Sequence, residues 1–153
     1  MAGLLICVIC IPSNKDATTH ALIHPNKLQI AQQFWATKPR RDFLITIRAI
    51  ESNDNYKAVG ASGELGAYQI SRAYWLDSGV SGNWEDVRDN AYAEAVMFWY
   101  FTRYASEALW NDDFEHLAKL HNGGPSQTTT RDVQVYWDKV QSKLSPKGIE
   151  LEH

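Results

Sequence analysis

Apolar side chains recur three and four residues apart along most of this chain, and that spacing is what most limits its fold. Near the middle of the N-terminal half, Phe43, Leu44, Ile47 and Ile50 fall on one side of a helix. A Ser-Asn-Asp-Asn sequence follows and ends that helix, because these residues favour turns. The pattern predicts helices over 25–37, 42–51, 71–76, 86–108, 113–121 and 130–144. We therefore expect a mainly α-helical protein.

The stretch over residues 56–70 departs from this pattern. Gly60, Gly63 and Gly66 recur every three residues, with few bulky apolar side chains between them. Glycine favours tight turns and lets backbone segments approach closely. We therefore predict a small Gly-rich hairpin or loop lobe beside the helices.

The chain is long enough to form one folded domain. It has 153 residues, 44% of them hydrophobic, with six Trp, seven Tyr and five Phe. This content excludes an intrinsically disordered body. The formal net charge of −3 does not indicate a nucleic-acid partner. No internal repeat is present, so we predict a single domain over residues 24–148.

The two ends of the chain are expected to lie outside that domain. Residues 1–23 contain an apolar run that is too short to span a bilayer and is typical of a secretory leader, although no basic residue precedes it. A secreted, periplasmic or cell-wall location is the corresponding expectation. Cys7 and Cys10 lie in this run without the further ligands of a zinc site, so we predict neither a metal nor a cofactor. Residues 151–153 resemble the beginning of an expression tag.

Glu51 is the first candidate for chemistry. It falls in the last turn of a predicted helix, where the negative end of the dipole disfavours a second negative charge. It also follows Ile47 and Ile50 and so borders the apolar stripe. Both features favour the protonated carboxyl, whereas an ion pair with Arg48 would favour the carboxylate. Taken alone, a helix-end glutamate is usually solvated, and its position does not make it catalytic.

Two ordered motifs give Glu51 a context. The first comprises Glu51-Ser52, Asn55, Ala58-Val59, Gly63 and the run from Gly66 to Ile70. The second is His121-Asn122-Gly123-Gly124, about fifty residues later. Together they resemble the signature of goose-type lysozymes and soluble lytic transglycosylases, over roughly residues 40–140.

The resemblance implies a lysozyme-like, α+β catalytic domain and a role for each matched position. Glu51 corresponds to the general acid, and Ser52 and Gln69 to residues that support the acid or the sugar. Tyr68 falls on a groove-lining position, and Asn122 on a polar contact to the sugar. Amides, hydroxyls and aromatic faces are the groups that bind sugars.

Two positions depart from the family pattern in the second motif. His121 stands where the family usually has Tyr, and Gly124 where it has Ala. The change at His121 alters the stacking or hydrogen bonding expected there. We expect Glu51 to border a glycan-binding cleft between the Gly-rich loop and Asn122, with Gln69 and Tyr68 on one wall.

The type of reaction depends on a second carboxylate. An inverting hydrolase places one about 6.5–9.5 Å from the acid, and a retaining hydrolase places it closer. Glu64, in the Gly-rich loop, is the best candidate for a base or electrostatic stabiliser, whereas Asp54 is expected to belong to a turn. The resemblance implies that a lytic transglycosylase needs no such group, because the muramic acid 6-hydroxyl attacks instead of water.

The sequence therefore leaves several functions open. The first is a muramidase that cuts the β-1,4 bond between N-acetylmuramic acid and N-acetylglucosamine in peptidoglycan. The second is a lytic transglycosylase that leaves 1,6-anhydro ends. A catalytically silent peptidoglycan- or chitin-binding module, a chitin-cutting enzyme and a structural helical protein are the other candidates. The oligomeric state is not predicted.

Overall fold

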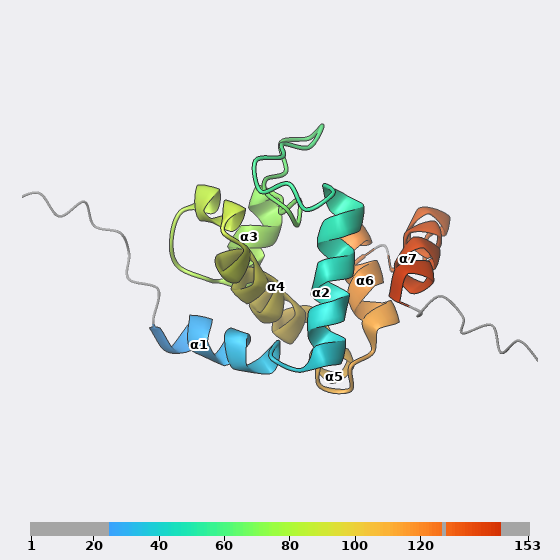
Figure 1. The fold of residues 1–153 in the computed structure, drawn as a ribbon, viewed down its shortest axis with the longest axis horizontal. Helices are drawn as coiled ribbons and strands as arrows, with labels where there is room; N and C mark the ends of the chain where they lie inside the picture. Colours follow the sequence, from blue (N-terminus) through green and yellow to red (C-terminus); the bar gives the residue numbers. More distant parts are fainter. Residues whose placement is uncertain (1–24, 127, 145–153) are drawn as a thin grey trace, which may run out of the picture.

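The computed structural model describes residues 25–126 and 128–144, and within them the protein is mainly α-helical, as predicted (Figure 1). The predictions for residues 1–23, including Cys7 and Cys10, and for residues 151–153 lie outside the described residues. The helices are α1 (Pro25–Phe34), α2 (Lys38–Glu51), α3 (Arg72–Ser78), the 3-10 helix η1 (Trp84–Arg88), α4 (Asn90–Tyr104), α5 (Ser106–Trp110), α6 (Phe114–Gly123) and α7 (Arg131–Leu144).

Helix α2 positions the predicted catalytic glutamate. Its buried residues include Phe43, Leu44 and Ile47, which confirms the predicted apolar stripe. The helix begins at Lys38 and not near Asp42, four residues earlier than predicted, with Pro39 in its first turn. Proline is tolerated in the first helical turn, where its missing N–H would have no helical partner.

Helix α4 runs through the middle of the molecule, in contact with α1, α3, α5 and α6 (Figure 1). Most of its residues are buried, among them Met97 and Phe101, as expected for a central helix. The long helix predicted over 86–108 is, however, divided into η1, α4 and α5. Asp89 caps α4 by accepting a hydrogen bond from the Tyr92 amide at 2.9 Å, and Ala105 leaves helical geometry at φ −150°.

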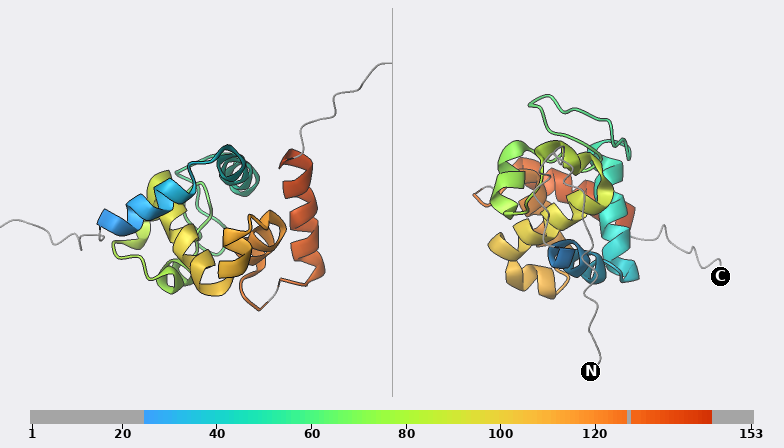
Figure 2. Two further views of the ribbon diagram at one scale, coloured as in Figure 1. Left: turned by 90° about the horizontal axis from the view of Figure 1, so that it is seen from below. Right: turned by 90° about the vertical axis from the view of Figure 1, so that its left-hand side faces the viewer.

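The Gly-rich segment projects beyond the ends of α2 and α3 (Figures 1 and 2). No strand is assigned over residues 25–126 and 128–144, and the expected hairpin is reduced to two isolated antiparallel bridges, Val59 with Leu65 and Leu65 with Ile70. Gly66 has a φ of +78°, and a Cβ there would lie 2.6 Å from the Val87 carbonyl oxygen. The segment therefore needs glycine at this position to pack against η1.

Helix α7 closes the side of the molecule opposite α1 and packs against α2 and α6 (Figure 2). Val133, Tyr136 and Val140, which lie three and four residues apart, form its buried face. Helix α6 ends beside it, so the C-terminal ends of α2 and α6 both lie close to α7. No helix in the described part of the chain is long and apolar enough to cross a membrane.

Candidate active site

Glu51 is the last residue of α2, and its side chain is only 17% exposed. Its Oε1 accepts a hydrogen bond from the Tyr136 hydroxyl of α7 at 2.6 Å. Burial raises the pKa of Tyr136, and the nearby Glu51 charge raises it further, so this phenol remains a donor across the ordinary pH range. The carboxyl group is therefore held in one position by a neighbouring helix.

His121, on the last turn of α6, lies behind the same carboxyl group. Its side chain is 3% exposed, and its Nε2 is 3.7 Å from Glu51 Oε1. Burial lowers the pKa of His121 from its ordinary value of 6.5, although the Glu51 charge and the Tyr68 backbone carbonyl act in the opposite direction. His121 is therefore neutral at pH 7, and its contact with Glu51 is not an ion pair.

Tyr74 of α3 completes the wall behind His121. Its hydroxyl lies 3.4 Å from His121 Nδ1, and the two rings meet edge to face with centroids 5.5 Å apart. Tyr74 also stacks on Tyr100 of α4, with centroids 3.6 Å apart. The imidazole is thus fixed by aromatic packing, which limits its rotation beside Glu51.

Most of the predicted site residues meet around one pocket of about 250 Å³, which we call the Glu51 pocket. The expected convergence of the Gly-rich loop and the end of α6 on Glu51 is therefore present. The pocket is lined by Glu51, Gly60, Ala61, Glu64, Gln69, His121 and Asn122.

Glu64 and Gln69 both lie over Gly60 in this pocket. A Cβ on Gly60 would collide with Glu64 Oε2 and would lie 2.6 Å from Gln69 Oε1. Glu64 Oε2 also accepts from the Ser62 amide at 3.1 Å. Gln69 has a φ of +49°, and its Nε2 donates to the Gly66 carbonyl at 2.8 Å. A left-handed backbone at a non-glycine residue is strained, and here it directs the amide oxygen into the pocket.

Ser52 and Tyr68 do not line the Glu51 pocket. The Ser52 hydroxyl donates to the Ala67 carbonyl at 2.9 Å and accepts from the Asn55 amide at 3.0 Å, so it joins the end of α2 to the loop. Tyr68 is fully buried, and its hydroxyl donates to Glu94 Oε1 at 2.7 Å. The expected place of Tyr68 on a groove wall is therefore corrected: its ring belongs to the core because the phenol has a buried carboxylate partner.

Arg48 does not pair with Glu51. Its Nε lies 3.4 Å from Asp54 Oδ1, beyond the end of α2. The ion pair between Arg48 and Glu51 that the sequence left open is therefore not formed, because Arg48 lies beside Asp54 instead. Asp54 belongs to the turn after α2, as the sequence indicated, with a φ of +60°.

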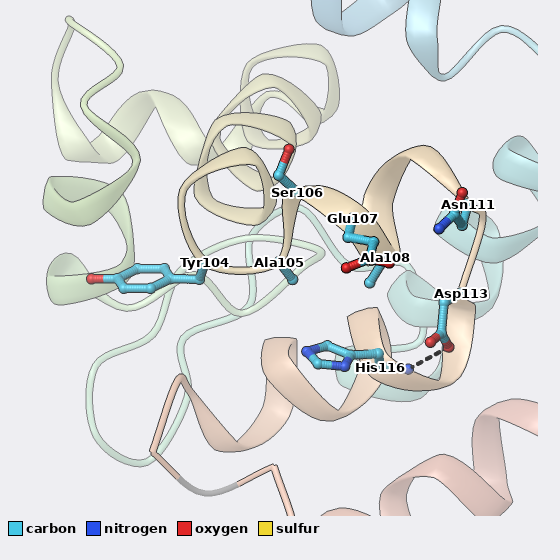
Figure 3. A pocket seen from close by; sticks show the side chains of 8 residues that line it. All are labelled: Tyr104, Ala105, Ser106, Glu107, Ala108, Asn111, Asp113 and His116. Carbon is cyan, nitrogen blue, oxygen red and sulfur yellow. Dashed lines mark hydrogen bonds between the residues drawn. The ribbon is translucent and has the colours of Figure 1, made fainter.

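A larger hollow of about 450 Å³ lies at the other end of α6 (Figure 3). Its lining includes Tyr104, Glu107 and His116, and none of the predicted site residues reaches it. Asp113, on the same wall, caps α6 by accepting from the His116 amide at 3.0 Å. Volume alone therefore does not identify the site, because the matched motif residues gather at the smaller pocket.

Sequence reasoning missed Tyr136 and Tyr74. The apolar spacing of the last helix places Tyr136 on its buried side, and its ring is indeed buried there. Its hydroxyl reaches a carboxyl group 85 residues away in the chain, a contact that periodicity cannot indicate. Within residues 25–126 and 128–144, no group of three or more His, Cys, Asp or Glu side chains is arranged to hold a metal ion.

Comparisons with known proteins find several lysozymes among the relatives of this chain. Lysozyme 1 of Crassostrea virginica is 33% identical over 84 residues, which is 54% of this chain and 46% of that protein. A lysozyme of Meretrix lusoria is 31% identical over 87 residues, covering 56% of this chain and 71% of the relative. An invertebrate-type lysozyme of Ruditapes philippinarum is 31% identical over 89 residues, covering 56% of this chain and 65% of the relative.

The alignment with the first of these relatives spans about half the length of that protein. No protein-family model matches the sequence. The relatives support the lysozyme-like resemblance in its broad form and point to invertebrate lysozymes, not to goose-type lysozymes in particular.

Proposed function

The chain belongs to the lysozyme family, and from this we propose that it is a muramidase acting on bacterial peptidoglycan. The bond cut is the β-1,4 bond between N-acetylmuramic acid and N-acetylglucosamine. The observation that carries the proposal is the Glu51 pocket, in which a half-buried helix-end carboxyl group faces polar side chains of the Gly-rich loop and of α6. Secretion or delivery to the cell wall is part of the same proposal.

Glu51 is the proposed general acid. Breaking a glycosidic bond requires a proton donor beside the leaving oxygen. Glu51 is held by Tyr136, lies beside a neutral His121 and has no ion pair with Arg48. The carboxyl group is therefore fixed in position without a cationic side chain paired to it, an arrangement that supports a proton-donating role.

Glu64 is the proposed second carboxylate, and Gln69 and Asn122 the proposed sugar-binding amides. The Glu64 side chain lines the same pocket as Glu51, where it can act as a base toward water or stabilise positive charge on the sugar ring. A transglycosylase has no need of this group, so its presence supports hydrolysis. The amides of Gln69 and Asn122 offer both donors and acceptors to sugar hydroxyl and acetamido groups.

The experiment is clearing of purified peptidoglycan by the wild type, Glu51→Gln and Glu64→Gln, with mass spectrometry of the released fragments. Glu51→Gln keeps an oxygen that can accept from Tyr136 and removes only the acidic proton, so a loss of about 100-fold or more is expected. Glu107→Gln, an exposed change in α5 outside the pocket, is the matched control.

Each product identifies a reaction. Reducing-end fragments indicate hydrolysis, and 1,6-anhydro ends indicate a transglycosylase. Full activity of Glu51→Gln would remove Glu51 from the mechanism. If none of the proteins clears peptidoglycan but the wild type still binds it, the chain would be a binding module and not an enzyme.

A further inference from the structure

A second pocket, of about 300 Å³, adjoins the Glu51 pocket on the side of α7. It is lined by Asn122, Asp132, Val135, Tyr136 and Lys139, and we call it the α7 pocket. Asn122 lines both pockets, and Tyr136 lines one while donating its hydroxyl to Glu51 in the other. A ligand in the Glu51 pocket would therefore have the α7 pocket directly beside it.

The chemistry of the α7 pocket differs from that of the Glu51 pocket. Lys139 is exposed, and its ammonium group makes no ion pair with another described residue. Asp132 is also exposed and lies seven residues earlier on the same face, about 10 Å away at 1.5 Å per residue. Val135, 45% exposed, lies between them. The pocket thus presents a cation, an apolar surface and an anion in a line.

We propose that the α7 pocket binds the stem peptide that peptidoglycan carries on its muramic acid units. The proposal rests on the function proposed above and names the part of the substrate that this face recognises. A stem peptide carries carboxylates, small apolar side chains and an amino group. Lys139 pairs with a peptide carboxylate, Val135 contacts an apolar side chain, and Asp132 receives the amino group.

The charges at both ends of the α7 pocket favour a stem peptide over a bare sugar chain as its ligand. A neutral chitin strand offers hydroxyl and acetamido groups, which do not require an unpaired ammonium group. An exposed ion pair is weak, so the contribution of Lys139 is to select between substrates and is modest in size. The side chain is a specificity-determining residue and takes no part in bond cleavage.

The test measures binding, using the full chain with Glu51→Gln so that ligands are not cut. Tetrasaccharide peptidoglycan fragments with stem peptides are compared with chitotetraose, which has the same backbone without the lactyl group or peptide. Adding Lys139→Gln is expected to weaken binding of the peptide-bearing fragment about two- to fivefold and to leave chitotetraose unchanged. Lys139→Arg should restore binding, and Lys143→Gln, the same change one turn further along α7, should alter neither ligand.

The outcomes separate this proposal from the proposed function. Equal effects of Lys139→Gln on both ligands, or an effect on neither, would overturn the role of the α7 pocket while leaving the muramidase in place. Failure of the parent protein to bind either ligand would instead overturn the peptidoglycan substrate and, with it, the stem-peptide site.

Discussion

Gly60 shows how one residue can shape the site through the space it leaves. Its lack of a side chain admits the carboxylate of Glu64 and the amide oxygen of Gln69 above the backbone. Both atoms are the ends of flexible side chains and can move aside, whereas the Glu64 Cβ, 3.2 Å from the same position, would need to shift only by a few tenths of an ångström. The glycine is needed at this position for close approach.

Gly60→Ala is therefore expected to reduce activity about tenfold or more, because displacement of groups by about 1 Å can have large effects on catalysis. The melting temperature should change little. Gly63→Ala is the matched control: no atom lies within 4 Å of its Cβ position, but its φ is +91°. That change should cost about 1 kcal/mol of folding stability while leaving activity nearly unchanged. Activity assays and thermal melts of both variants check the pair, and the reverse pattern would contradict it.

His121 gives the site a pH dependence with a definite sign. Its pKa in the folded protein is lowered from 6.5, so the unfolded chain binds a proton at a higher pH than the folded chain does. As the pH falls below about 6.5 toward the folded value, the unfolded state gains protons first and the protein loses stability. Above 6.5 this contribution is constant.

His121→Gln should remove that part of the pH dependence while keeping a polar group beside Glu51. The difference in unfolding free energy between wild type and variant should shrink or reverse as the pH is lowered from 7 through the window below 6.5. Urea unfolding at a series of pH values measures it. A difference that stays constant across this range would show that His121 does not titrate as proposed.

At the scale of elements, the end of α2 is joined to the loop by Ser52. Its hydroxyl contacts the Ala67 carbonyl and the Asn55 amide, on either side of the Gly-rich turns. Ser52 and Gln69 were both predicted to support the acid or the sugar, and the structure gives Ser52 contacts with the backbone. Through these bonds the hydroxyl fixes the position of Glu51, at the end of α2, relative to Glu64 and Gln69 in the loop.

Ser52→Ala is expected to lower folding stability by about 1–3 kcal/mol, because two hydrogen bonds of a half-buried hydroxyl are lost. Activity should fall as well, since the loop that carries Glu64 is no longer held against α2. Ser142→Ala, which removes an exposed hydrogen bond within α7, is the control and should have little effect on either. Denaturant unfolding and rates of peptidoglycan clearing measure both effects. Equal behaviour of the Ser52 and Ser142 variants would contradict the prediction.

The sequence predicted elements well where the signal was local. The end of α2, the start of α6 near residue 113 and the course of α7 all follow from adjacent residues. It failed over 86–108, where continuous apolar spacing concealed the cap at Asp89 and the break at Ala105. A side-chain cap can end or begin a helix even where the apolar spacing continues, and the spacing alone does not show where such a cap forms.

The site was predictable only in part, for a related reason. Glu51, Glu64 and Gln69 lie close together in sequence, and the resemblance indicated Asn122 and His121. The partner of Glu51 comes from α7, and the partner of Tyr68 comes from α4. Such contacts depend on how the helices pack, which the sequence pattern does not show. A tyrosine also fits a groove wall or a core, and its sequence position alone does not distinguish the two.

At the scale of the whole molecule, a buried polar network joins the loop to the helical body. Glu94 of α4 is 6% exposed, and its two carboxylate oxygens accept from Tyr68 and from Arg41 of α2, each at 2.7 Å. The Trp35 indole donates to the Glu94 carbonyl at 3.0 Å. A buried carboxylate requires partners such as Tyr68 and Arg41, so this network specifies how α2, α4 and the loop assemble, and the Trp35 bond joins the residue after α1 to them.

Tyr68→Phe tests whether this tyrosine serves the fold or the sugar. Removing its hydroxyl leaves one buried Glu94 oxygen without that donor, and a loss of about 1–3 kcal/mol in folding stability is expected. KM for peptidoglycan fragments should stay unchanged, because the ring does not line the Glu51 pocket. Tyr56→Phe, at a side chain that is 55% exposed, should change neither quantity. A raised KM with unaltered unfolding free energy for Tyr68→Phe would instead make Tyr68 a sugar contact and require the loop to open when substrate binds.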